Sequence, residues 1–157
     1  MATISLLDIL LKELVKVDFC ATDKKDALNK IADLFYEKKV VKNREDFHKN
    51  LLGRETLGST AFNDGVAIPY AISDTDYDIA SGLLISKKGI DFDSLDKKPT
   101  HIFVIITGKD KRDMRDNLYL KYLAHVVTLL KNKDFRNELI QANRPSEIFD
   151  VMAKYER

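Results

Sequence analysis

The sequence predicts a single α/β domain, residues 1–157, built as a sandwich in which helices flank both faces of a mixed β-sheet. Helical periodicity occupies both ends of the chain, whereas short β-like runs separated by glycines fill the middle. The run Ile102–Ile106 is apolar at every position, so this strand is expected to be covered on both faces. A chain of 157 residues with no internal repeat or linker is the size of one such domain.

The N-terminal third is predicted to contain three helices and one strand. Residues 4–11 are expected to form a short helix capped by Ser5, and residues 14–19 alternate as a half-buried strand does. Apolar residues recur at three- and four-residue spacing from 22 to 38, which predicts a helix with Thr22 as its N-cap. The next helix is expected at about 44–55.

The remainder of the chain is predicted to add strands and then helices. The expected strands, each bounded by turn residues, are Val66–Ile68, Ile79–Ser86, Ile90–Phe92 and His101–Thr107. Charges of both signs make Lys109–Asp116 a predicted solvated loop, and a long helix is expected from Asp113 to Leu130. Two further helices follow at about 133–142 and 145–155, the second opened by a proline in its first turn.

Composition excludes several classes of protein. There are 26 basic and 25 acidic residues, so no long-range field favours nucleic acid or anionic lipid as a partner. No apolar run approaches the ~20 residues that cross a bilayer, and charges interrupt the N-terminal apolar stretch, unlike a secretory signal. The single cysteine, Cys20, cannot form an internal disulfide and is expected to be a small core or strand-end residue. We therefore expect a cytoplasmic protein.

The segment with candidate chemistry runs from residue 54 to residue 71. It contains the pair Arg54-Glu55, the turn Gly58-Ser59-Thr60, and the strand end Ala67-Ile-Pro-Tyr-Ala71. Backbone amides around such a turn, two hydroxyl groups and a guanidinium are groups that bind anions. Turns of this composition are common, so the segment alone is also compatible with a purely structural role.

These motifs resemble the signature of the phosphotransferase-system enzyme IIA domains of the fructose, mannitol and nitrogen-regulatory class. The resemblance continues through the segments 89–96, 118–130 and 134–148, and so covers nearly the whole chain. It implies the fold of the mannitol and fructose enzymes IIA. It also implies phosphocarrier proteins, permease components or regulators as partners, with no cofactor and no metal.

The resemblance breaks at the residues that carry the family's chemistry. Working members have a phospho-acceptor histidine after the proline and a second, assisting histidine at the start of the long helix. This chain has Tyr70 and Tyr119 at the matching positions. Ala61 and Asn63 also stand where glycines are usual. The binding residues that the resemblance implies are Arg54, Ser59, Thr60, Tyr70 and Tyr119, with no catalytic residue assigned.

A phenol is poorly suited to relay a phosphoryl group. An ordinary phenol has a pKa of about 10, so only about one molecule in a thousand is phenolate at pH 7. Imidazole is nucleophilic near neutral pH and leaves readily once phosphorylated, whereas an aryl phosphate is a much poorer donor. The family is a phosphotransferase, but these two tyrosines predict that this chain is not catalytic.

Three functions remain open from the sequence. The first is a regulatory protein-binding module that has lost phosphoryl transfer. The second is an active phosphocarrier with another acceptor, although His48, His101 and His125 fall outside the acceptor motif and are expected to be structural or surface residues. The third is a sensor of small anions at Arg54 and the 58–60 turn. The two tyrosine rings could also simply pack together, with hydroxyl partners such as Arg54 or Thr60.

Overall fold

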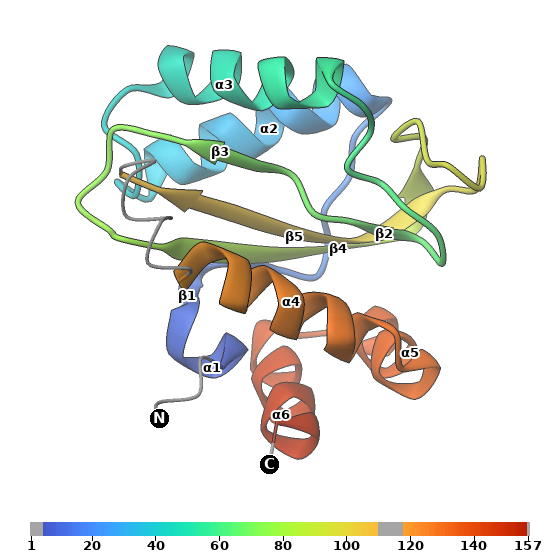
Figure 1. Cartoon of the computed structure of the whole chain (residues 1–157). Coiled ribbons are helices and arrows are strands. Elements are labelled where there is room, and N and C mark those ends of the chain that lie inside the picture. The colour runs from blue at the N-terminus through green and yellow to red at the C-terminus, as the bar shows by residue number, and fades with distance from the viewer. Residues whose placement is uncertain (1–4, 110–117, 157) are drawn as a thin grey trace.

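The computed structural model describes residues 5–109 and 118–156 and has helices on both sides of one sheet (Figure 1). In these residues, three helices and five strands occupy the first two thirds of the chain, and three helices complete it. The elements in order are α1 (Leu6–Ile9), β1 (Leu10–Lys16), α2 (Lys24–Glu37), α3 (Arg44–Thr56), β2 (Val66–Ala67), β3 (Tyr70–Ile72), β4 (Ala80–Ile90), β5 (Thr100–Gly108), α4 (Leu118–Leu130), α5 (Lys133–Gln141) and α6 (Pro145–Tyr155).

The five strands form a mixed sheet, which confirms the predicted fold class. The order is β1–β4–β5–β2, and β3 also pairs with β5. The β4–β5 pair is antiparallel, whereas β1 runs parallel to β4, and β2 and β3 run parallel to β5. The central strand β5 is therefore the one to which both short strands of the candidate site are attached.

Each face of the sheet has its own apolar core. Ile102, Val104 and Ile106 of β5 pack with α1, α4, α5 and α6, whereas Phe103 and Ile105 pack with α2 and α3. Successive strand residues point to opposite faces, so a strand covered on both sides must be apolar throughout. Figure 1 shows the two helical layers on either side of the sheet. The prediction for residues 102–106 is confirmed.

Several predicted boundaries are wrong. The first strand begins at Leu10, inside the predicted helix, because β1 pairs with β4 at Leu10 and again at Val15 and Lys16, with an irregular register between Leu10 and Val15. Asp23 rather than Thr22 caps α2, its side chain accepting from the Asp26 amide at 2.8 Å. The predicted strands 79–86 and 90–92 are largely one strand, β4, with an irregular register between Ile85 and Ile90.

Some expectations fall on residues outside those described. They are the expected start of the long helix at Asp113, most of the charged stretch Lys109–Asp116, and the first residue of the helix expected at 4–11. Among residues 5–109 and 118–156, no helix combines the length and the apolarity needed to cross a membrane.

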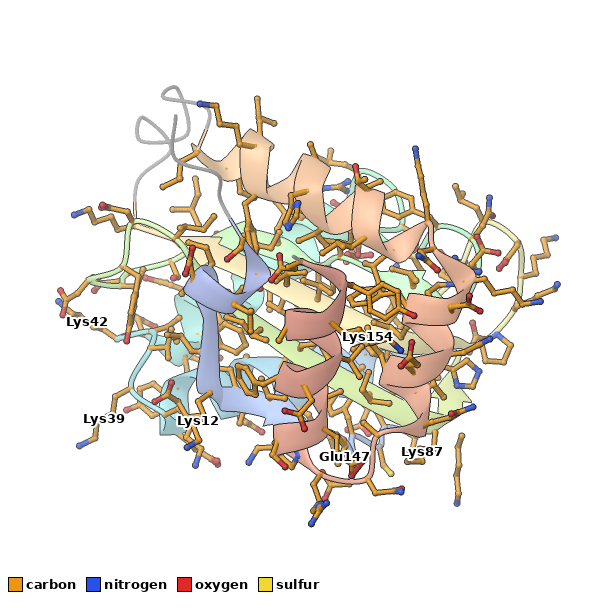
Figure 2. The ribbon with its side chains drawn as sticks, turned by 90° about the horizontal axis from the view of Figure 1, so that it is seen from below. Lys12, Lys39, Lys42, Lys87, Glu147 and Lys154 are labelled. Atoms are coloured by element: carbon orange, nitrogen blue, oxygen red, sulfur yellow. The ribbon has the colours of Figure 1, made fainter. Side chains whose placement is uncertain are left out.

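Polar contacts between residues distant in sequence connect α1, α4 and α5 to other parts of the chain. The buried carboxylate of Glu156 accepts from the Leu6 and Leu7 amides at 2.7 and 3.0 Å and is also paired with the imidazole of His125. The Lys87 ammonium, labelled in Figure 2, donates to the carbonyls of Ile140 and Ala142 at 2.6 and 2.8 Å. These contacts satisfy backbone groups at the start of α1 and at the end of α5 that the helices themselves leave open.

Candidate functional site

Tyr70 is placed by an interruption between two short strands. Pro69 has no amide hydrogen, so it cannot donate to a neighbouring strand. Its carbonyl nevertheless accepts from the Ile106 amide at 3.0 Å, and the chain resumes pairing with β5 as β3. The expected strand Val66–Ile68 corresponds to β2, which ends at Ala67, but β3 was not predicted. Ala71 faces the α2 and α3 layer, whereas the half-buried Tyr70 packs against the opposite core.

Three segments bring Tyr70, Tyr119 and Arg54 together. The rings of Tyr70 and Tyr119 are 5.2 Å apart between centroids and tilted by 52°. The Arg54 guanidinium carbon lies 4.8 Å from the Tyr70 centroid, within the range of a cation–π contact. The two positions that the family resemblance assigns to histidines are therefore neighbours, as the sequence interpretation required. Arg54 covers the face of the ring and does not bind a tyrosine hydroxyl.

Burial makes Tyr119 chemically inert at neutral pH. Its ring is almost wholly buried, and its hydroxyl has no hydrogen-bond partner among the described residues, contrary to the expectation of a partner such as Arg54 or Thr60. Burial raises the pKa of the Tyr119 phenol well above the ordinary range, and the neighbouring Tyr70 raises it further, against a smaller opposing effect of Arg54. A phenolate at this position would be an unpaired charge in an apolar surrounding.

Alkaline titration is expected to detect this buried phenol. The pKa of the Tyr119 phenol is higher in the folded protein than in the unfolded chain, where it is about 10. Its contribution to the free energy of unfolding is therefore complete below that pH and decreases as the pH rises above it. In a titration followed by tyrosinate absorbance, part of the absorbance change should occur well above the ordinary tyrosine pKa. Tyr119→Phe should reduce only this high-pH part of the change. The control is the urea-unfolded protein, whose tyrosines should ionise together. Early loss of amplitude in the variant would contradict the prediction.

The Gly-Ser-Thr turn uses its polar groups internally. The Ser59 hydroxyl donates to the Phe92 carbonyl at 2.9 Å and accepts from the Ala61 amide at 3.1 Å. The amide of the buried Thr60 donates to Glu55 at 3.1 Å, and its hydroxyl is bonded to the same carboxylate. Gly58 donates to the Glu55 carbonyl and accepts from Arg54 at 2.9 Å. The groups that were candidates for an anion site are thus largely engaged.

Glu55 organises this turn together with a lysine that the sequence did not single out. The Glu55 side chain is only 5% exposed, and one carboxylate oxygen lies 2.8 Å from the Lys24 ammonium. Lys24 also lies 5.0 Å from the ring centroid of Phe92 and 3.5 Å from the Ser59 hydroxyl. The Glu55 carboxylate therefore connects the start of α2, the end of α3 and the Gly-Ser-Thr turn. Arg54 does not pair with Glu55, and its guanidinium donates instead to the Gly58 carbonyl.

Two of the three histidines are held by polar contacts away from the tyrosine pair. His101 is bonded to the Ser86 carbonyl at 2.9 Å, and His125 is paired with Glu156. The Nε2 atom of His48, on α3, is buried without a hydrogen-bond partner in the part of the chain described. None of these rings is hydrogen-bonded to Tyr70 or Tyr119 within that part. They are placed as structural residues.

The described residues hold no group of three or more histidine, cysteine, aspartate or glutamate side chains able to bind a metal ion. Cys20 is exposed and lies beyond the end of β1 at Lys16, so the expectation of a core or strand-end residue is wrong.

Solved structures share this fold over most of their length. The nitrogen regulatory protein IIA-Ntr of Neisseria meningitidis superposes with a TM-score of 0.82 at 21% identity, covering 94% of this chain and 98% of that one. The mannitol enzyme IIA of Escherichia coli, solved in complex with phosphorylated enzyme IIB, gives a TM-score of 0.70 at 14% identity, with 90% and 95% covered. The architecture is that of the phosphotransferase-system IIA proteins.

The sequence comparison defines the family. Residues 8–155 match the model of the phosphoenolpyruvate-dependent sugar phosphotransferase system, EIIA 2, and the chain belongs to this family. It is 25% identical over 150 residues to the fructose-specific EIIABC component of Bacillus subtilis, which covers 96% of this chain but only 23% of that protein. It is 27% identical over 147 residues to the fructose-specific EIIA component of Haloferax volcanii, with 90% of each covered.

Proposed function

We propose that this chain is a regulatory EIIA-type module, formed by residues 1–157, that has lost phosphoryl transfer and acts by binding other proteins. The observation that carries the proposal is the Arg54–Tyr70–Tyr119 stack at the position where the family resemblance puts two histidines. A phenol is a weak nucleophile at neutral pH, and its phosphate ester is a poor donor. Tyr119 cannot assist as a base, because burial keeps it protonated.

Exposed apolar side chains that lie close in sequence to Arg54, to the Gly-Ser-Thr turn and to Tyr119 support a protein-binding role. Leu57, Phe62 and Leu120 are 83%, 41% and 54% exposed. Leu57 follows α3 immediately before the Gly-Ser-Thr turn, Phe62 follows the turn, and Leu120 is next to Tyr119 on α4. Large apolar groups exposed around one site are typical of protein interaction surfaces. We call Leu57, Phe62 and Leu120 the apolar rim.

The proposed partner is a component of the phosphotransferase system or a regulator connected with it. The mannitol IIA protein of similar fold was solved with a phosphorylated IIB partner, and the resemblance in sequence extends to nitrogen regulatory proteins. Arg54 offers a cation beside the half-buried Tyr70, which suits an acidic or phosphorylated group on the partner. Binding of a phosphorylated partner without acceptance of its group is the regulatory activity that we propose, exerted in the cytoplasm.

The first test is phosphorylation. The purified chain is incubated with phosphoenolpyruvate and the general phosphotransfer proteins, and its intact mass is followed. The mass is expected to stay unchanged, while a IIA domain with the acceptor histidine, included as positive control, gains roughly 80 Da, one phosphoryl group. A stoichiometric gain on this chain that maps to Tyr70 or to any histidine would overturn the proposal.

The second test is binding, measured by calorimetry with a phosphocarrier protein and a IIB domain. Phe62→Ser and Leu57→Ser are each expected to weaken binding about tenfold, which corresponds to about 1.4 kcal/mol. Tyr36→Ser is the matched control, because Tyr36 is also an exposed large side chain but lies on α2. Equal effects of all three substitutions, or no binding to either protein, would count against the apolar rim.

A further inference from the structure

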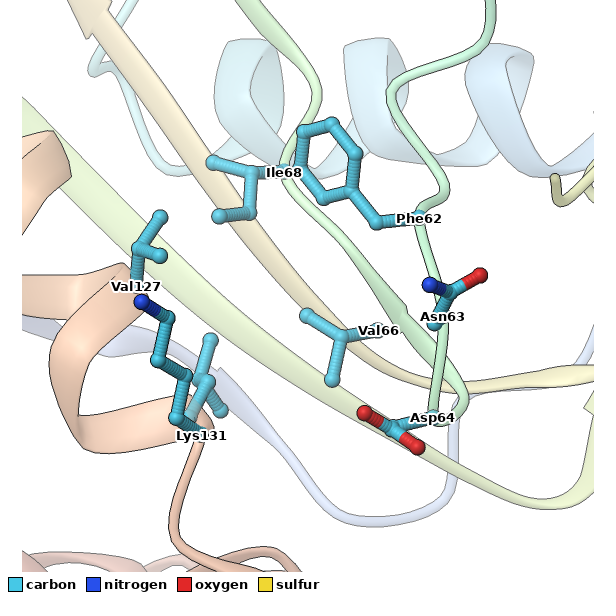
Figure 3. Close-up of a pocket in the computed structure, with 8 residues that line it drawn as sticks. Phe62, Asn63, Asp64, Val66, Ile68, Val127 and Lys131 are labelled. Atoms are coloured by element: carbon cyan, nitrogen blue, oxygen red, sulfur yellow. The ribbon is translucent and has the colours of Figure 1, made fainter. Parts of the chain in front are cut away.

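A partly open cavity lies on the side of the sheet occupied by α4 and does not include the tyrosine pair. Its volume is about 290 Å³, and it lies between the Phe62–Val66 turn and the C-terminal half of α4 (Figure 3). Its apolar surface comes from the aromatic ring of Phe62 and from four aliphatic side chains, Val66, Ile68, Val127 and Leu130. This volume is close to the lower end of the range of small-molecule sites.

The wall formed by the turn is ordered by one hydrogen bond within the turn and one to a neighbouring loop. The Phe62 amide donates to the Val66 carbonyl at 3.0 Å, and the Asp64 amide donates to the Asp96 carboxylate at 3.1 Å. Asp64 and Gly65 both have positive φ angles, 65° and 75°, which aspartate tolerates and glycine adopts freely. The turn therefore holds its shape without a ligand, and a ligand need not supply the entropy cost of ordering it.

Opposite charges stand at the two sides of this apolar surface. Asp64 lies on the turn and Lys131 just after α4, and Figure 3 shows the lysine running back toward Val127, across the cavity from Asp64. Lys131 forms no ion pair or hydrogen bond through its ammonium within the described residues. Asp64 has one ion-pair partner in the described part of the chain, the Arg136 Nη2 atom at 4.0 Å, the outer limit of such a contact, while the Nη1 atom donates to the carbonyls of Leu130 and Lys131. The Asp64 side chain is 62% exposed, so a ligand can reach both Asp64 and Lys131.

We propose that this cavity binds a free amino acid with an aliphatic or aromatic side chain. The α-ammonium would pair with Asp64, the α-carboxylate with Lys131, and the side chain would cover the valine, isoleucine and leucine surface. Asn63, whose side chain also lines the cavity, can donate to the carboxylate. The two charges favour a free amino acid over an apolar side chain of a partner protein, which carries neither an ammonium nor a carboxylate on its backbone. The proposal does not rest on the protein-binding function, although Phe62 belongs both to the apolar rim and to the lining of the cavity.

The test uses the full chain with methyl-labelled valine, isoleucine and leucine, titrated by NMR with L-leucine and L-phenylalanine. Saturable shifts are expected at Val66, Ile68, Val127 and Leu130. Asp64→Asn and Lys131→Gln are each expected to weaken binding at least tenfold. Lys133→Gln is the matched control, because this neighbouring exposed lysine does not line the cavity. Filling the cavity by Val127→Phe should abolish the shifts, and thermal unfolding confirms that each variant is folded.

Ligands that lack one charge separate recognition of a zwitterion from simple apolar binding. Isopentylamine and 4-methylpentanoate carry leucine's side chain with only the amine or only the carboxylate, and each is expected to bind at least tenfold more weakly than L-leucine. Equal binding of all three compounds would overturn the proposal, as would the absence of shifts at about 20 mM ligand, beyond the usual affinities of metabolite sites. Methyl shifts produced only by a phosphocarrier or IIB protein would assign the cavity to protein docking and overturn it too.

Discussion

Replacing Tyr70 and Tyr119 together by histidine is expected to turn this chain into an efficient phosphoryl acceptor. Tyr70→His supplies a nucleophile at the position next to Pro69, in contact with Arg54. This single change should give only weak phosphorylation, because the neighbouring Tyr119 is a buried phenol that cannot assist the new imidazole. The double substitution is expected to raise the initial rate about 100-fold over Tyr70→His, the usual contribution of a positioned polar partner.

The rates are measured from intact mass and from acid-labile phosphate after addition of phosphoenolpyruvate and the general phosphotransfer proteins. Tyr119→His and Tyr70→Phe serve as controls, and neither should become phosphorylated. Equal rates for Tyr70→His and the double variant would show that Tyr119 does not limit transfer. Phosphorylation of the Tyr70→Phe control would show that the acceptor lies elsewhere in the chain.

Glu55→Ala is expected to lower the free energy of unfolding by about 2–4 kcal/mol. The change removes the acceptor for the Thr60 amide and hydroxyl and leaves the Lys24 ammonium without its carboxylate. Glu55 is nearly buried, so water cannot fully replace these bonds. Urea unfolding gives the free energy, and the NMR signal of the Thr60 amide reports whether the turn itself has changed.

Two variants show whether the effect belongs to the buried network. Glu45→Ala, an exposed glutamate at the start of the same helix, is expected to cost less than about 1 kcal/mol. Lys24→Met should destabilise more than Lys25→Met, since the exposed Lys25 neighbours Lys24 on α2 but forms no ion pair among the described residues. Similar losses for Glu55→Ala and Glu45→Ala would refute the assignment of a structural role to Glu55.

Hydrophobic periodicity was sufficient to predict elements in which the buried positions and the local conformational preference of the residues agree. The strand at 102–106 and the helix beginning after Asp23 bury apolar residues at the spacing that their geometry requires, and both were predicted. Capping was predicted to within one residue, because Thr22 and Asp23 are both good N-caps. The structure chooses aspartate, whose carboxylate reaches the Asp26 amide.

Elements that depend on pairing at long range could not be predicted in the same way. Residues 10–13 satisfy a helical pattern equally well, and their strand conformation comes from parallel pairing with β4. A three-residue strand such as β3 has too few residues to show a period, and a proline directly precedes it. Its existence follows from the open hydrogen-bonding positions of β5.

The sequence predicted which tyrosines meet at the candidate site, but it did not predict the hydrogen bonds and the ion pair around Glu55. The motif placed Tyr70 and Tyr119 together, because family resemblance carries spatial information that spacing alone lacks. The partners of Glu55 and the engagement of the Gly-Ser-Thr turn were missed, since Lys24 is one of many lysines and nothing local distinguishes it. Ion pairs between segments distant in sequence have no signature in a single sequence.

The carboxylate of Glu156 links the two ends of the described chain. Because it holds the first turn of α1 while it is paired with a histidine of α4, the last helix cannot detach without releasing the beginning of the chain. Fraying at either end is therefore a shared event, in which the opening segment, the closing helix and the long helix between them loosen together.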